Sequence, residues 1–215
     1  MKFTLIHMLE FNLINSCNYK CKMSSVTIDM LELNLTTKRL KIKRFCKKDI
    51  DQVFNLFQNQ EVLYYYLPDP IETITKTELA DFLSDWDDDA SSFLFSCFLN
   101  EELVAIFSLE DFSLKQSRTE CGIALVDQKF YGKGYAIEIV AAMVEYLFRK
   151  VNLNRIYIRY IEGNTRSYQL FSKLGFKYEG SLRQHVKRDH QYLNMNYMGL
   201  LKSEYLTMNN IEVCD

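Results

Sequence analysis

Two closely spaced glycines in Tyr131-Gly-Lys-Gly-Tyr-Ala136 are the residues most suited to chemistry in this chain. They follow a short apolar run ending at Val126 and precede a long apolar stretch typical of a helix. A glycine-rich loop that opens a helix presents main-chain N–H groups at the positive end of the helix dipole. The loop therefore predicts a binding site for a phosphate or pyrophosphate group.

The residues around these glycines exclude two common nucleotide motifs. A dinucleotide-binding fingerprint needs a third glycine at position 137, where this chain has Ile137. A phosphate-binding loop of the Walker type needs Ser or Thr after Gly-Lys, and Lys133 is followed by Gly134. The predicted ligand is a phosphorylated cofactor of another kind.

Apolar patterning places the loop inside a mixed α/β domain. Alternating or continuous apolar runs predict strands over residues 39–45, 93–99, 103–109, 120–126, 155–161, 182–188 and 192–201. Periods of three and four predict helices from 48 to between 63 and 67, from 73 or 75 to 86, over 135–150 and over 165–174. Pro68 and Gly175 are natural stops for the first and last of these helices. This order predicts helices on a partly antiparallel sheet.

Composition narrows the class of protein. The chain has 215 residues, 48% of them hydrophobic and 25% charged, with a net charge of −2. These values predict one globular domain and argue against a general nucleic-acid binder, which carries a basic face. No apolar run approaches the ~20 residues that span a bilayer, so we expect no membrane partner. Scattered cysteines, with no second pair beside Cys17 and Cys21, predict free thiols, no metal site and a cytoplasmic location.

A second pattern lies some thirty residues beyond the glycine loop. A predicted strand ends in Glu162-Gly-Asn164, and Leu174-Gly-Phe176 follows. With Lys129-Phe-Tyr-Gly-Lys-Gly134, these residues resemble the paired motifs of the GCN5-related N-acetyltransferase (GNAT) superfamily, over roughly Leu35 to Tyr205. Glu120-Cys-Gly-Ile is most similar to the branch that holds ribosomal-protein-alanine and spermidine N-acetyltransferases.

The resemblance implies a fold and a division of the chain. The fold is a mixed, mostly antiparallel sheet of six to seven strands with strands four and five splayed apart, flanked by about four helices. Residues 1–34 are expected to be an N-terminal extension, 35–206 the GNAT N-acetyltransferase domain and 207–215 a C-terminal tail.

The resemblance also implies acetyl-CoA as the acetyl donor. The loop amides would hold the pyrophosphate, Leu125 and Val126 would offer a free strand edge to the pantetheine arm, and Asn164 would bond to that arm. A freed N–H on that edge would polarise the thioester carbonyl. The complete set of expected cofactor contacts is Leu125, Val126, Lys129, Tyr131, Gly132, Lys133, Gly134, Tyr135, Ala136, Asn164 and Phe171.

Two catalytic candidates come from the same resemblance. Glu120 matches a glutamate that family members use as a base or to hold the amine, and Ser167 matches a serine proposed as a proton source. Many members have a tyrosine as general acid where this chain has Phe171, which has no proton to give. The structural alternatives are an edge-strand carboxylate for Glu120 and a helix-start hydroxyl for Ser167.

The chemical class of the acetyl acceptor is inferred from the distribution of charged residues along the sequence. Acids dominate one segment and would steer a cationic amine: Asp69, Glu72, Glu78, Asp81, Asp85, Asp87, Asp88 and Asp89. The tyrosines at 64–66 and the closing hairpin (His185, Tyr192, Tyr197) are candidates for the acceptor pocket. A polyamine and a protein N-terminal amine are the favoured acceptors, and an amino sugar or aminoglycoside is an alternative. The other functional hypothesis is a non-catalytic CoA-binding module, and a homo-oligomer is compatible with both.

Overall fold

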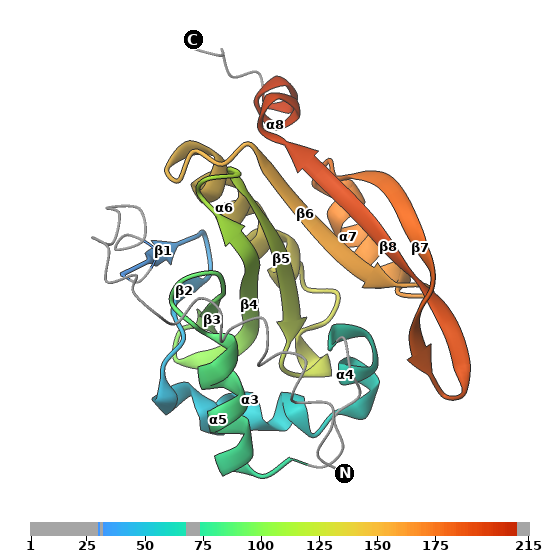
Figure 1. Cartoon of the computed structure of the whole chain (residues 1–215). Coiled ribbons are helices and arrows are strands. Elements are labelled where there is room, and N and C mark those ends of the chain that lie inside the picture. Colours follow the sequence, from blue (N-terminus) through green and yellow to red (C-terminus); the bar gives the residue numbers. More distant parts are fainter. Residues whose placement is uncertain (1–29, 31, 68–73, 210–215) are drawn as a thin grey trace, which may run out of the picture.

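One eight-stranded mixed sheet organises this protein, for which the computed structural model describes Met30, residues 32–67 and residues 74–209 (Figure 1). The strand order is β1-β2-β3-β4-β5-β6-β8-β7. Neighbouring strands are antiparallel except for β5 and β6, which are parallel. The strands are β1 (Asn34–Thr36), β2 (Lys41–Arg44), β3 (Phe93–Leu99), β4 (Glu102–Ser113), β5 (Arg118–Leu125), β6 (Arg155–Ile161), β7 (Lys177–Arg188) and β8 (Gln191–Leu201).

Helices cover both faces of the sheet. The larger core lies on the face where α6 buries Ile139, Met143 and Leu147, and the smaller core lies on the face covered by α3, α4 and α5. In Figure 1, α6 and α7 lie behind the strands. The helices are α3 (Ile50–Phe57), α4 (Gln60–Tyr66), α5 (Lys76–Trp86), α6 (Tyr135–Arg149), α7 (Thr165–Lys173) and α8 (Lys202–Met208), with 3₁₀ turns at Lys47–Asp49 and Gln128–Phe130.

The predicted α/β fold of the GNAT type is confirmed, with differences of detail. The sheet gains β1, which has only three residues and is too short to show alternation in the sequence. The helix expected from residue 48 onward is two helices, because the Asn59 side chain accepts a hydrogen bond from the N–H of Val62 and starts α4. The C-terminal α8 was not predicted, so the described residues hold six α-helices and not about four.

The domain boundaries stay a prediction, because residues 1–29 and 210–215 lie outside the described residues. Two side chains of the expected extension, Met30 and Leu33, are buried in the larger core. At the other end, α8 continues to Met208, across the expected boundary after residue 206.

Strands β5 and β6 are joined over only a short part of their length. The paired residues are Arg118 with Arg155, Thr119 with Ile156, and Glu120 with Tyr157. Beyond Glu120 both strands continue without pairing to each other, to Leu125 and Ile161. The expected splay of the fourth and fifth predicted strands is therefore present, and it exposes main-chain groups of β5 to any ligand in the gap.

Two further expectations concern the whole molecule. Cys97 and Cys121 are free thiols, as the scattered cysteines predicted, and both are buried. Within the described residues, no helix combines the length and the apolar character that crossing a membrane requires.

Candidate active site

The glycine loop has the backbone conformation that its sequence predicted. Gly132 and Gly134 have φ angles of 71° and 79°, in the left-handed region that L-residues with a side chain avoid. Gly134 is the N-cap of α6, so the first N–H groups of this 15-residue helix open onto the loop. At Gly132, no atom lies within 4 Å of the place a Cβ would occupy. The loop therefore leaves open space beside its amides, which fits the pyrophosphate of CoA.

Arg39 holds this loop from the opposite side. Its Nη1 donates to the carbonyl oxygen of Lys133 at 3.0 Å, and its guanidinium lies 4.6 Å from the centroid of the Tyr135 ring. Glu138, in the first turn of α6, accepts from Nε of Arg39 at 2.6 Å and from the hydroxyl of Thr37 at 2.6 Å. The sequence carries no local signal for the role of Arg39, because its partners lie about a hundred residues away along the chain.

A cavity of about 740 Å³ runs from the glycine loop to the gap between β5 and β6. Its lining joins elements that are far apart in the sequence: α4, strands β4 to β6, the loop and α7. Ten predicted site residues line it: Glu120, Leu125, Tyr131, Gly132, Gly134, Tyr135, Ala136, Asn164, Ser167 and Phe171. The structure thus brings most of the expected donor site together.

Three expected donor contacts, Val126, Lys129 and Lys133, are not among the lining residues. The N–H of Val126 donates to Val104 on β4 at 3.0 Å, so it is not available to a ligand in the gap. Lys129 forms an ion pair with Glu102 at 2.5 Å instead.

The free edge of β5 is displaced by one residue from the expected one. Because N–H groups alternate sides along a strand and that of Val126 faces β4, the N–H groups of Leu125 and Ile123 face the gap. Both residues line the cavity. The pair that offers a free edge is therefore Ile123 and Leu125, and not Leu125 and Val126.

The first turn of α7 places two predicted residues in the cavity. The Oδ1 atom of Asn164 accepts from the N–H of Ser167 at 3.1 Å and caps the helix. The amide nitrogen of Asn164 is then the atom that can donate to a carbonyl of the pantetheine arm. Phe171 is 3% exposed and packs edge-on against Phe176 with ring centroids 5.1 Å apart.

Two glutamates face each other at the point where the sheet opens. Glu110 on β4 and Glu120 on β5 are directly opposite in the strand register. Glu120 is 8% exposed and accepts from Nε of Arg159 at 2.8 Å. Burial raises the pKa of Glu120, although Arg159 acts to lower it. For Glu110, burial and then the negative charge of Glu120 raise the pKa to about 7, against the smaller lowering effects of Arg159 and of hydrogen bonds from Ser108 and Trp86.

Of these three residues, Glu120 was predicted from the sequence, whereas Glu110 and Arg159 were not. The predicted strand ended at Leu109, whereas β4 continues to Ser113 and carries Glu110 into the site. Only the pairing register reveals that Glu110 and Glu120 are neighbours, and the register depends on non-local contacts.

A second cavity, of about 340 Å³, reaches the same carboxylates. Glu110, Glu120 and Arg159 line both cavities, so the two cavities meet at this cluster. The remaining lining residues of the second cavity are Ser92, Asp111, Tyr157 and Tyr197. This arrangement allows a donor and an acceptor to approach the carboxylates by different routes.

A small space is kept open beside the cluster. A Cβ at Gly122 would lie 2.7 Å from the hydroxyl of Ser108, so a larger residue there would displace the serine. The hydroxyl of Tyr66 is buried and lacks a hydrogen bond of ordinary geometry among the described residues, with the Ser108 hydroxyl as its polar neighbour. Burial raises the pKa of Tyr66. Its hydroxyl is a neutral polar group, placed in the wall of the donor cavity where a ligand can satisfy it.

The acidic segment that suggested a cationic acceptor has other partners. Arg44 binds Asp87 and Asp89, Glu78 caps α5 through Thr75, and Asp88 accepts from the N–H groups that follow it. None of the acids of this segment that the structure describes lines either cavity, and Asp69 and Glu72 lie outside the described residues. The acids next to the site come from β4 and β5 instead.

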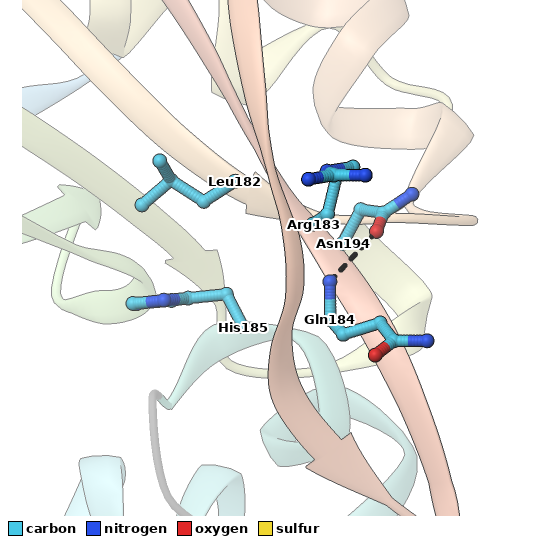
Figure 2. Close-up of a pocket in the computed structure, with 5 residues that line it drawn as sticks. All are labelled: Leu182, Arg183, Gln184, His185 and Asn194. Carbon is cyan, nitrogen blue, oxygen red and sulfur yellow. Dashed lines mark hydrogen bonds between the residues drawn. The ribbon is translucent and has the colours of Figure 1, made fainter.

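Only some of the tyrosines and hairpin residues expected at the acceptor pocket line a cavity of the site. Tyr65 and Tyr66 line the first cavity and Tyr197 lines the second, whereas Tyr192 is 62% exposed. His185 lies in a separate open depression where β7 is bulged, with Leu182, Arg183, Gln184 and Asn194 (Figure 2). Figure 2 shows these side chains on both sides of the hairpin, with the Gln184 N–H donating to Asn194 at 2.9 Å. No acid lines this depression, and we do not assign it to the reaction.

Comparison with known proteins agrees with this geometry. The model of the acetyltransferase (GNAT) domain matches residues 39–177. The chain is 28% identical over 174 residues to the uncharacterized N-acetyltransferase p20 of Bacillus licheniformis, covering 80% of this chain and 97% of that protein. It is 26% identical over 167 residues to spermidine N(1)-acetyltransferase of Escherichia coli strain K12, covering 78% of this chain and 88% of that protein.

A solved structure shares the fold. Spermidine N-acetyltransferase from Vibrio cholerae, in complex with CoA and spermine, superposes with a TM-score of 0.71 at 23% identity, covering 78% of this chain and 98% of that one. Because the family model covers more than half of the sequence, this protein belongs to the GNAT acetyltransferase family and is an N-acetyltransferase that uses acetyl-CoA.

Proposed function

We propose that this enzyme acetylates a small cationic primary amine, with a polyamine as the first candidate. The observation that carries the proposal is the lining of the second cavity, which has three carboxylates (Glu110, Asp111 and Glu120) and one cation (Arg159), while Arg118 pairs with Asp111 from outside the lining. A cavity with this balance attracts an ammonium group and focuses it on the carboxylates. The similarity to a spermidine N(1)-acetyltransferase supports the same substrate class.

Acetyl-CoA supplies an acetyl thioester to this site. In the proposal, the loop amides from Tyr131 to Ala136 hold its pyrophosphate, and Asn164 together with the β5 edge positions its pantetheine arm. The N–H of Ile123 or Leu125 faces the gap and donates to the thioester carbonyl, as an oxyanion donor does. Glu120, fixed by Arg159, holds the acceptor ammonium from the other side.

The departing thiolate needs a proton, and Ser167 is the proposed relay. Ser167→Ala should lower kcat by about 2- to 10-fold, the effect of losing one modest hydrogen bond, with KM for acetyl-CoA unchanged. Steady-state kinetics measures both constants. Ser172→Ala, an exposed serine of the same helix, is the matched control. Equal rates in the two variants would remove Ser167 from the reaction.

Release of free thiol from acetyl-CoA tests the proposed function. We expect turnover with spermidine and a KM for spermidine that rises with salt, since screening weakens attraction to the acidic cavity. Turnover only with an N-terminal peptide of a ribosomal protein, or only with an aminoglycoside, would move the assignment to that amine. Tight binding of acetyl-CoA without turnover of any amine would support the non-catalytic module. A cytoplasmic location and a homo-oligomer stay predictions.

A further inference from the structure

We propose that Glu110 is the base that accepts the proton of the acceptor ammonium, while Glu120, which Arg159 holds in place, binds that ammonium beside it. This inference rests on the proposed function and assigns a step that the sequence motifs left to Glu120. Its basis is the position of Glu110 at the junction of the two cavities, directly across the β4–β5 ladder from Glu120. An amine that enters through the second cavity meets both carboxylates before it reaches the donor side.

The two carboxylates have different partners, and the difference separates their roles. Glu120 is bonded to a guanidinium, which is positively charged at every accessible pH and acts to lower the pKa of Glu120 against the larger effect of burial. Among the described residues, the groups that donate hydrogen bonds to Glu110 are neutral, namely Ser108 and Trp86. A carboxylate with no cation hydrogen-bonded to it is the more basic of a close pair, because the neighbouring negative charge disfavours its ionisation.

The groups that face Glu110 come from every element around it. They are Glu120 from β5, Arg159 and Tyr157 from β6, Tyr197 from β8, Tyr66 from α4, Trp86 from α5, and Ser108 and Asp111 from β4. Asp111 is engaged by Arg118 at 2.9 Å and by the hydroxyl of Tyr157 at 2.7 Å. Of the acids near the junction, Glu110 is thus the one with no charged donor bonded to it. Its pKa of about 7 matches the demand on a base that works at neutral pH.

Glu110 takes one proton from the ammonium, and the neutral nitrogen forms a bond to the acetyl carbon. As the carbon–sulfur bond breaks, the nitrogen loses a second proton and the sulfur takes one. The products are the acetamide and free CoA, with one net proton released to solvent from Glu110. No oxidant, reductant or metal is required.

The pH dependence of kcat/KM for spermidine tests the assignment. With a base of pKa about 7 and an amine of pKa ~10, the wild type should show a plateau between these two values. In Glu110→Gln only the neutral amine reacts, so kcat/KM should rise about tenfold per pH unit up to pH ~10. The loss should be about 100- to 1000-fold near pH 7 and should shrink steadily above it.

Three controls make the result decisive. Glu101→Gln, in the turn at the far end of β4, removes a carboxylate outside both cavities and should leave the profile unchanged. Glu110→Asp keeps a carboxylate on a shorter side chain and should restore the plateau at a reduced rate. Carboxyl-carbon NMR of the protein without substrates should show one glutamate that titrates near 7 and disappears in Glu110→Gln.

The outcomes separate the two proposals. If the wild type releases no CoA with any amine, the proposed function fails and the base assignment fails with it. If the wild type acetylates spermidine while Glu110→Gln keeps the plateau, only the assignment of Glu110 is overturned. If Glu110→Gln binds acetyl-CoA with wild-type affinity and loses the plateau, both proposals are supported.

Discussion

Gly134→Trp should abolish the binding of acetyl-CoA and leave the protein folded. Gly134 lies at the N-cap of α6 with a φ angle of 79°, and it lines the donor cavity. The nearest atom to a Cβ at this position is Nη2 of Arg39, at 3.5 Å, so the substitution meets a flexible side chain and no backbone. An indole would occupy the space beside the amides that the pyrophosphate needs, while the strained φ angle costs about 1–2 kcal/mol of stability.

Calorimetric titration with acetyl-CoA measures this effect. We expect Kd to rise by at least about 100-fold, which corresponds to a loss of about 2.7 kcal/mol of binding free energy. Gly134→Ala tests the strain alone and should weaken binding much less. Gly180→Trp, in β7 outside both cavities and with no atom within 4 Å of its Cβ position, controls for the bulk of the new side chain. Wild-type affinity in Gly134→Trp would place the cofactor elsewhere.

The donor loop was predictable because its signal is local. Left-handed φ angles at Gly132 and Gly134, and a helix beginning at Tyr135, follow from residues next to one another in the chain. The same is true of the Thr75 cap of α5 and of Gly175 after α7. Main-chain geometry of this kind is dictated by residue types over a few positions.

The acceptor side was only partly predictable because its residues meet through long-range pairing. The register between β4 and β5 brings Glu110 opposite Glu120. The short parallel pairing of β5 with β6 brings Arg159 close to Glu120. A dense run of acids was the stronger signal in the sequence, yet Asp87 and Asp89 form ion pairs with Arg44 on β2. Charge density in a segment does not reveal which charges are used to hold the segment in place.

The second large effect is expected from Glu110→Gln, which should raise the free energy of unfolding. Most substitutions at partly buried sites lower it. Glu110→Gln should stabilise the protein at pH 8 and have little effect at pH 4.5. The folded-state pKa of Glu110, about 7, lies above its usual value of 4.5 because burial and Glu120 disfavour the charge. The protonated form therefore stabilises the fold fully below pH 4.5, and this contribution is lost as the pH rises through 7. Glutamine is neutral at every pH, so the variant keeps this stabilising contribution at pH 8.

The difference between the two pKa values sets the size of the effect. A shift from 4.5 to about 7 corresponds to about 3 kcal/mol as an upper value, since Glu110 is not completely buried. Urea unfolding of both proteins at pH 4.5 and pH 8 measures it as a change in midpoint at constant slope. Titrating groups that do not interact with Glu110 are common to both proteins and cancel in the comparison.

Glu138→Gln provides a control of opposite sign. Burial acts to raise the pKa of Glu138, but hydrogen bonds from Thr37 and Arg39 outweigh it and hold the pKa below the usual value. Ionised Glu138 therefore stabilises the fold above its unfolded pKa, and Glu138→Gln should destabilise the protein at pH 8 and less at low pH. A pH-independent difference for Glu110→Gln would mean that its carboxylate ionises without cost. In that case nothing in the folded state would hold Glu110 ready to take a proton from an ammonium group at neutral pH.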